Sequence, residues 1–191
     1  MTMDVFTAAR RAMVLNQLRP QGVTNPGVLA AMGTVAREAF VPEAMRAAAY
    51  SDRSLVLGGG APMMPSAELG ILLNALDPKA GEKALVIGQG GAYSAAVLEA
   101  LGLEVTRSDA DAPSGRESFD IVLFEGSVAS LPDWVAGLLA PGGRVGAAIL
   151  DKGVARLSVG RGNGGAIGFK SLADAQVPPL PALQARPQFI F

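Results

Sequence analysis

Hydrophobic residues recur at helical spacing through the first part of the chain. Their positions predict amphipathic helices over residues 6–18, 27–35 and 43–49. The second of these has a clear start signal, because Thr24 or Asn25 can cap it and Pro26 suits the first helical turn. We therefore expect residues 1–65 to form a helical N-terminal subregion.

The hydrophobic pattern changes after one further predicted helix at residues 66–76. Continuous apolar runs, which are typical of buried strands, occur at 84–87, 119–124 and 144–150, with a weaker one at 105–107. Helical spacing returns between these runs at 93–101 and 133–139. A strand, a glycine turn and a helix in this order are typical of a doubly wound α/β fold with a mostly parallel sheet.

The last forty residues are rich in glycine and proline and predict antiparallel pairing. Two candidate strands, 154–161 and 166–171, flank a glycine-rich turn at Asn163, which favours a C-terminal hairpin. Residues 189–191 are apolar and can add a last strand. No repeat or long linker divides the chain, so we predict a single domain over 1–191, with the sheet region at 66–191.

The composition limits the kinds of site and partner that the chain can have. Half of the 191 residues are hydrophobic and the net charge is −1, so a folded core is expected and clustered basic residues for nucleic acid or an anionic membrane are missing. The chain has neither cysteine nor histidine, which excludes disulfides, a Ser-His-Asp triad and a His-ligated metal site. The start of the chain lacks a signal-peptide pattern and apolar runs are short, so we expect a cytoplasmic protein.

The glycine turn between the first predicted strand and its helix is the first candidate site. Its residues are Gly88, Gln89, Gly90 and Gly91. Glycines here allow backbone N–H groups to approach a polar ligand, and the helix N-terminus adds partial positive charge. The alternative interpretation, about equally common, is that the glycines only allow the helix to pack on the sheet.

Several segments resemble the protein-L-isoaspartate O-methyltransferase family. They occur in the family's order along nearly the whole chain: RAMVLNQLRP (11–20), REAFVP (37–42), AYSD (49–52), GQGGAYSAA (88–96), FD (119–120), LAPGG (139–143) and PPLP (178–181). The resemblance implies an S-adenosylmethionine-dependent methyltransferase fold. It also implies methyl transfer to the carboxylate of L-isoaspartyl or D-aspartyl residues, and hence a protein or peptide partner.

The resemblance also implies which residues hold the cofactor. Gly88, Gln89, Gly90 and Gly91 match its first binding motif, and Asp109, at the end of the second strand, is the candidate acceptor for the ribose hydroxyls. Asp111 is the second candidate for this role, and a solvated loop charge is the alternative interpretation of either acid. A carboxylate is already nucleophilic and a sulfonium already electrophilic, so no catalytic residue is assigned and the protein mainly has to align the two.

Three departures from the family pattern fall on the site. The acid expected two residues before the first glycine is Val86, and the third glycine is Ala92. Residues 108–118 are too few for the helix, strand and adenine-binding turn that the fold normally has there. The family's Thr-Ile-Ser element is replaced by PMMP at 62–65, which offers no hydroxyl.

These departures predict a family member whose cofactor and substrate site is degraded. Such a protein has weak or no catalytic activity and acts as a scaffold or interaction protein. The missing strand–helix unit leaves the strand near Val105 at a sheet edge, where a homodimer can form. The alternative is an active carboxyl methyltransferase that repairs L-isoaspartyl and D-aspartyl residues.

Other side chains have two interpretations each. Glu125 either faces a ligand at the carboxyl edge of the sheet or is a surface loop charge. Arg19 and Arg53 either hold a substrate carboxylate or form ion pairs with nearby acids. Met63, Met64 and Trp134 are interpreted as core or interface residues rather than as ligand contacts.

Overall fold

The fold is built around one sheet in which parallel strands come first and antiparallel strands last. We describe it from a computed structural model covering residues 4–113, 117–163 and 166–183. The strand order is β4-β3-β5-β6-β7-β8, and neighbours are parallel as far as β6 and antiparallel beyond it. The strands are β3 (Lys83–Ile87), β4 (Glu104–Ser108), β5 (Phe119–Val128), β6 (Leu139–Asp151), β7 (Val154–Asn163) and β8 (Ala166–Ala175).

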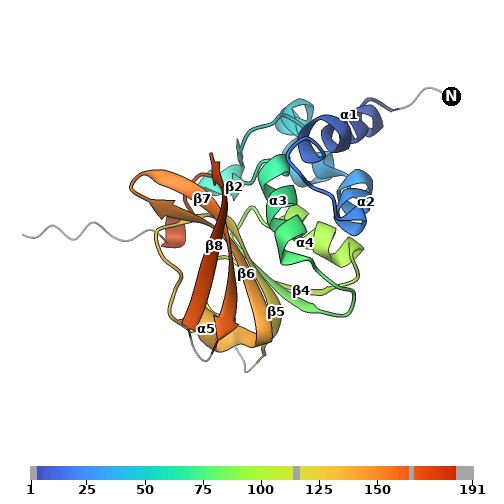
Figure 1. Cartoon of the computed structure of the whole chain (residues 1–191). Helices are drawn as coiled ribbons and strands as arrows, with labels where there is room; N and C mark the ends of the chain where they lie inside the picture. The colour runs from blue at the N-terminus through green and yellow to red at the C-terminus, as the bar shows by residue number, and fades with distance from the viewer. Residues whose placement is uncertain (1–3, 114–116, 164–165, 184–191) are drawn as a thin grey trace, which may run out of the picture.

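Four helices gather on one side of this sheet (Figure 1). The helices are α1 (Val5–Met13), α2 (Pro26–Thr34), α3 (Ser66–Leu76) and α4 (Ala92–Ala100), and the short α5 (Trp134–Leu138) packs on the opposite face. A small two-stranded ladder, β1 (Leu55–Val56) with β2 (Pro62–Met63), precedes α3.

Strand β5 shows why both faces of the sheet are apolar. Its side chains alternate between faces, so Ile121 and Leu123 join the core under α1–α4 while Val122 and Phe124 join the core under α5. All four are fully buried. A strand covered on both faces reads as a continuous apolar run, which is why this segment was predictable.

The predicted fold class is confirmed, with local differences. The first helix changes to a π-helix at Val14–Leu18, and the third predicted helix is a 3₁₀-helix at Glu43–Ala48. Strands β5 and β8 run several residues further than the apolar pattern indicated. The strand predicted at residues 189–191 lies outside the described residues.

The predicted shortening of the sheet is also present. Strand β4 is the outermost parallel strand, and residues 109–113 and 117–118, as far as the structure describes this connection, form neither helix nor strand before β5 begins. The next strand after β4, β5, lies on the other side of β3.

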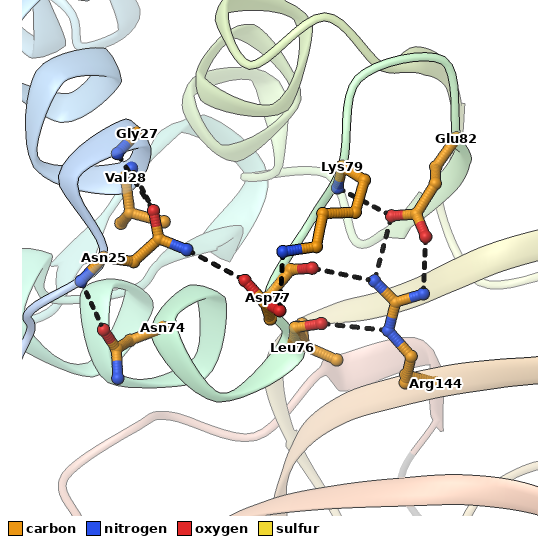
Figure 2. A network of polar contacts seen from close by, with 9 residues as sticks. All are labelled: Asn25, Gly27, Val28, Asn74, Leu76, Asp77, Lys79, Glu82 and Arg144. Carbon is orange, nitrogen blue, oxygen red and sulfur yellow. Dashed lines mark hydrogen bonds and ion pairs between the residues drawn. The ribbon is translucent and has the colours of Figure 1, made fainter.

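Polar side chains fasten α2 to the end of α3 (Figure 2). The Asn25 side chain accepts hydrogen bonds from the N–H groups of Gly27 and Val28, and thereby caps α2. The Asn74 side chain accepts from the Asn25 N–H at 2.9 Å, and Asn25 donates to the carboxylate of Asp77 at 3.1 Å. The start of one helix is therefore held by the last turn of another.

Candidate functional site

A cavity of about 370 Å³ opens beside the carboxyl ends of β3 and β4. Open α/β sheets bind their ligands at this carboxyl edge, near the point where the strand order reverses, which here lies between β3 and β5. Residues from four separate segments line it: Gly59, Ala61, Pro62, Gln89, Asp109, Leu180 and Pro181.

Two of the five predicted cofactor residues reach this cavity. Gln89 follows β3 and Asp109 follows β4, so the parallel pairing of these strands brings both side chains to one edge. The Gln89 side-chain amide donates to the Asp109 carboxylate at 3.3 Å, and both residues are exposed. The carboxylate keeps free acceptor capacity and can accept hydrogen bonds from a ligand's hydroxyl groups.

The three glycines of the turn lie behind the cavity, against the protein itself. A Cβ on Gly90 would lie 1.8 Å from the Pro62 carbonyl oxygen, and one on Gly91 would lie 2.5 Å from a methyl carbon of Val86. Both residues therefore pack closely against the protein, Gly90 against β2 and Gly91 against β3. Only a residue without a side chain allows β2 to lie this close to the turn.

Gly88 connects the turn to the neighbouring strand. Its N–H donates to the Ser108 carbonyl at 2.8 Å, and its φ of +124° lies in a region that favours glycine. A Cβ here would lie 2.9 Å from the Leu180 side chain. Gly88 thus allows both the turn and the approach of the C-terminal segment.

That C-terminal segment forms a wall of the cavity that the sequence did not predict. The N–H of Ser127 donates to the Pro178 carbonyl at 2.8 Å, and the N–H of Leu180 donates to the Ser127 carbonyl at 2.9 Å. These bonds hold Leu180 and Pro181 over the ends of β3 and β5. The PPLP motif was visible in the sequence, but nothing local indicated that it would close this cavity.

Both sequence interpretations of Glu125 are wrong, because this residue is neither a surface charge nor part of the lining of the cavity. It is fully buried, and its carboxylate accepts hydrogen bonds from the Met64 N–H at 2.8 Å and from the Ser94 hydroxyl. Burial raises the pKa of Glu125, while Ser94, the Met64 N–H and the positive charge of Arg37 oppose the rise.

Arg37 is a second buried charge, which the sequence showed only as part of a family segment. Its guanidinium donates to the carbonyls of Ala49 and Met64, at 2.8 and 2.6 Å, and lies 4.7 Å from the centre of the Tyr93 ring. Burial lowers the pKa of Arg37, and the nearby Tyr93 and Glu125 oppose this shift.

The remaining candidates divide as follows. Met63 and Met64 are fully buried and Trp134 packs partly buried against the core under α5, so their core interpretation is confirmed. Arg19 and Arg53 are exposed, and neither forms an ion pair with any residue that the structure describes.

A larger cavity, of about 840 Å³, lies away from the glycine turn. It is bounded by the loop at residues 52–54, the start of α3 and the adjoining ends of β7 and β8. Arg53 and Glu68 line it, whereas Gln89 and Asp109 do not. The smaller cavity is therefore the one that contains the predicted residues Gln89 and Asp109.

The sheet order and the glycine turn define a doubly wound α/β domain, and the cavity beside Asp109 lies at the carboxyl edge of its sheet. Comparison with known proteins gives the family. The model of the protein-L-isoaspartate(D-aspartate) O-methyltransferase family matches residues 9–108, and the chain belongs to this family.

Two relatives illustrate the extent of the match. The chain is 45% identical over 101 residues to protein-L-isoaspartate O-methyltransferase 1 of Rhodopseudomonas palustris, which covers 53% of this chain and 41% of the relative. It is 33% identical over 165 residues to the protein-L-isoaspartate O-methyltransferase of Methylorubrum populi, and this match covers 72% of this chain and 78% of the relative. The chain thus covers less than half of the first relative and most of the second.

Solved structures share the fold at low identity. A putative protein-L-isoaspartate O-methyltransferase of Plasmodium falciparum, in complex with S-adenosyl-L-homocysteine, has a TM-score of 0.72 at 16% identity and covers 91% of this chain and 98% of that one. Another protein-L-isoaspartate O-methyltransferase has a TM-score of 0.77, also at 16% identity, and covers 92% and 67%. Among the residues that the structure describes, no helix is long and apolar enough to cross a membrane.

Proposed function

We propose that this chain binds S-adenosylmethionine and transfers its methyl group to the carboxylate of L-isoaspartyl or D-aspartyl residues in proteins. The observation that carries the proposal is the pairing of Gln89 and Asp109 in one cavity at the ends of β3 and β4. Family membership supports the reaction, and the Plasmodium falciparum relative with bound S-adenosyl-L-homocysteine supports the ligand class.

The residues of the cavity fit the nucleoside part of this cofactor. Its volume of about 370 Å³ falls within the range of roughly 300–1,000 Å³ that is typical of small-molecule clefts. Asp109 offers carboxylate oxygens to ribose hydroxyls, while Ala61, Leu180 and Pro181 offer apolar surface to a base. The C-terminal segment thus supplies one apolar wall of the cavity.

In this proposal the chain binds and orients its ligands rather than moving protons. S-adenosylmethionine, when bound, supplies an electrophilic methyl group on a sulfonium, and the substrate carboxylate is the nucleophile. Among the described lining residues Asp109 is the ionisable group, and we assign it to binding. Pro62 and Leu180 exclude water from the cavity walls, which favours the aligned reaction.

Calorimetric titration with S-adenosyl-L-homocysteine tests cofactor binding. Asp109→Asn removes the charged acceptor and is expected to weaken affinity about tenfold, which corresponds to about 1.4 kcal/mol. Asp111→Asn is the matched control. Because Asp111 does not line the cavity, this substitution should change the affinity for S-adenosyl-L-homocysteine by less than about twofold. Absence of binding by the unmodified chain at millimolar ligand would contradict the proposal.

Transfer itself needs a second assay. A peptide with one L-isoaspartyl residue should incorporate labelled methyl groups from S-adenosylmethionine, and the same peptide with ordinary aspartate should not. Equal labelling of both peptides would contradict the proposed substrate class.

A non-catalytic scaffold is the second candidate function. It is favoured by Met63 and Met64, which are fully buried at the segment where the family pattern has a hydroxyl-bearing element. Binding of S-adenosyl-L-homocysteine without methyl transfer would support this candidate.

The homodimer predicted through the β4 edge and the cytoplasmic location stay predictions. Light scattering in solution tests the homodimer.

A further inference from the structure

Both backbone polar groups of Met64 are held by buried charged side chains. Its N–H donates to the carboxylate of Glu125 at 2.8 Å, and its carbonyl accepts from the guanidinium of Arg37 at 2.6 Å. Glu125 and Arg37 have no exposed surface, and neither lines the cavity. The two opposite charges therefore face each other across a single residue of the backbone.

Glu125 also joins the segment after β2 to the first helical turn after the glycines. Its second carboxylate oxygen accepts the hydroxyl hydrogen bond of Ser94, which lies in the N-terminal part of α4. The carboxylate thus connects α4, β5 and Met64. Arg37 adds a fourth segment, because it also binds the Ala49 carbonyl and lies over the ring of Tyr93 in α4.

Met64 belongs to the same segment of the chain as one wall of the cavity. Ala61 and Pro62 line the cavity and lie two to three residues before Met64 in the same extended segment. The Pro62 carbonyl lies so close to Gly90 that even a methyl group would not fit between them. A shift of Met64 would therefore move this wall, or press it into the glycine turn.

We propose that Glu125 and Arg37 are positioning residues that clamp Met64 and so set the cofactor affinity of the cavity. This inference rests on the proposed function, since the clamp acts on the site assigned to S-adenosylmethionine. Neither residue contacts the cavity, so both act through the backbone of residues 61–64. The carboxylate's hydrogen bond to Met64, rather than its charge alone, is the contact that transmits the effect.

The test compares S-adenosyl-L-homocysteine affinity with stability in two variants of Glu125. Glu125→Gln keeps an oxygen that accepts the Met64 N–H, so its dissociation constant should stay within about threefold. Glu125→Ala loses the contact and should bind at least about tenfold more weakly. Glu82→Gln is the matched control, because it breaks a partly buried ion pair with Arg144 away from the cavity and should lower the melting temperature without changing affinity.

An unchanged affinity in a folded Glu125→Ala protein would overturn the proposal, because Glu125 would then act on stability alone. If Glu125→Ala does not fold, Ser94→Ala removes one of the clamp's hydrogen bonds while leaving the carboxylate in place. It should weaken affinity about two- to fivefold. Its control is Ser158→Ala, another buried serine, whose hydroxyl donates within β7. Equal affinities for these two serine variants would count against the clamp.

Hydrogen exchange at the Met64 amide separates failure of the clamp from failure of the proposed function. In the ligand-free protein, this amide should exchange at least about tenfold faster in Glu125→Ala, or measurably faster in Ser94→Ala, than in the unmodified chain. An unmodified chain that binds no S-adenosyl-L-homocysteine contradicts the function, and fast exchange in the variants would still establish the clamp. Unchanged exchange in these variants overturns the clamp whatever the ligand result.

Discussion

The guanidinium of Arg144 and the carboxylate of Glu82 form a two-pronged hydrogen-bonded ion pair, with N···O distances of 2.7 and 2.9 Å (Figure 2). Arg144 also donates to the carbonyls of Leu76 and Asp77, at 2.9 and 3.2 Å, and so satisfies the end of α3. One side chain on β6 thereby connects the last turn of α3 to the turn that leads into β3.

Removing this connection should destabilise the fold. Arg144→Met leaves two carbonyls without this donor and leaves the Glu82 carboxylate with the Lys79 N–H as its remaining partner. We expect the free energy of unfolding to fall by about 2–3 kcal/mol. Urea denaturation monitored by circular dichroism measures the change. Lys79→Ala is the control, because it removes only an exposed ion pair with Asp77 and should cost less than about 1 kcal/mol. Similar losses in both variants would contradict the assigned role of Arg144.

The same ion pair predicts a pH dependence of stability. The hydrogen bond from Arg144 holds the pKa of Glu82 below its ordinary value of 4.5, although burial acts in the other direction. The Glu82 carboxylate is therefore harder to protonate in the folded state than in the unfolded state. Ionised Glu82 stabilises the fold above pH 4.5, and this contribution is lost as the pH falls through the pKa of Glu82 in the folded state. Urea midpoints between pH 7 and pH 3 should show a smaller acid-induced loss for Glu82→Gln than for the unmodified chain. An identical loss in both would show that Glu82 is not one of the groups responsible.

Substitution of Gly90 tests the tight approach of β2 to the glycine turn. A Cβ at Gly90 would overlap the Pro62 carbonyl, so Gly90→Ala should force β2 away and cost about 1–3 kcal/mol in unfolding free energy. Binding of S-adenosyl-L-homocysteine should weaken at the same time. Gly58→Ala is the matched control, since a Cβ there meets no atom within 4 Å. A tolerated alanine at Gly90 would mean that the turn and β2 are further apart.

The helix cap at Asn25 gives a prediction independent of the cavity. Asn25→Ala removes the acceptor for the N–H groups of Gly27 and Val28 and should lower the unfolding free energy by about 1 kcal/mol. Thermal unfolding followed by circular dichroism measures the shift. Asn16→Ala, at an exposed position, should have little effect, and cofactor affinity should be the same in both variants.

Local pattern was sufficient for most of the elements, because each depends on residues close in sequence. The apolar run of β3 was recognised without tertiary information, and the cap of α2 was limited to Thr24 or Asn25, of which the structure shows Asn25. Gln89 and Asp109 were named from the family resemblance, and they lie side by side because the parallel strands β3 and β4 place their carboxyl ends at one edge.

The rest of the site depended on contacts between distant segments. Leu180 packs beside Gly88 although about ninety residues separate them, and no local pattern encodes that approach. Glu125 and Arg37 are charged residues, which are rarely buried, so their sequence positions gave no reason to place them in the interior. Their burial is possible because each finds backbone partners on segments that only the folded chain brings together.

The amino-acid sequence by itself determined the order of helices and strands, the shortened parallel sheet and the family, because periodicity and motifs are local properties. Only the tertiary structure decided which glycines face a cavity and which face the protein, how the C-terminal segment forms a wall, and where two buried charges meet Met64. These features arise from packing between elements far apart in the chain, and close packing leaves room for only one arrangement.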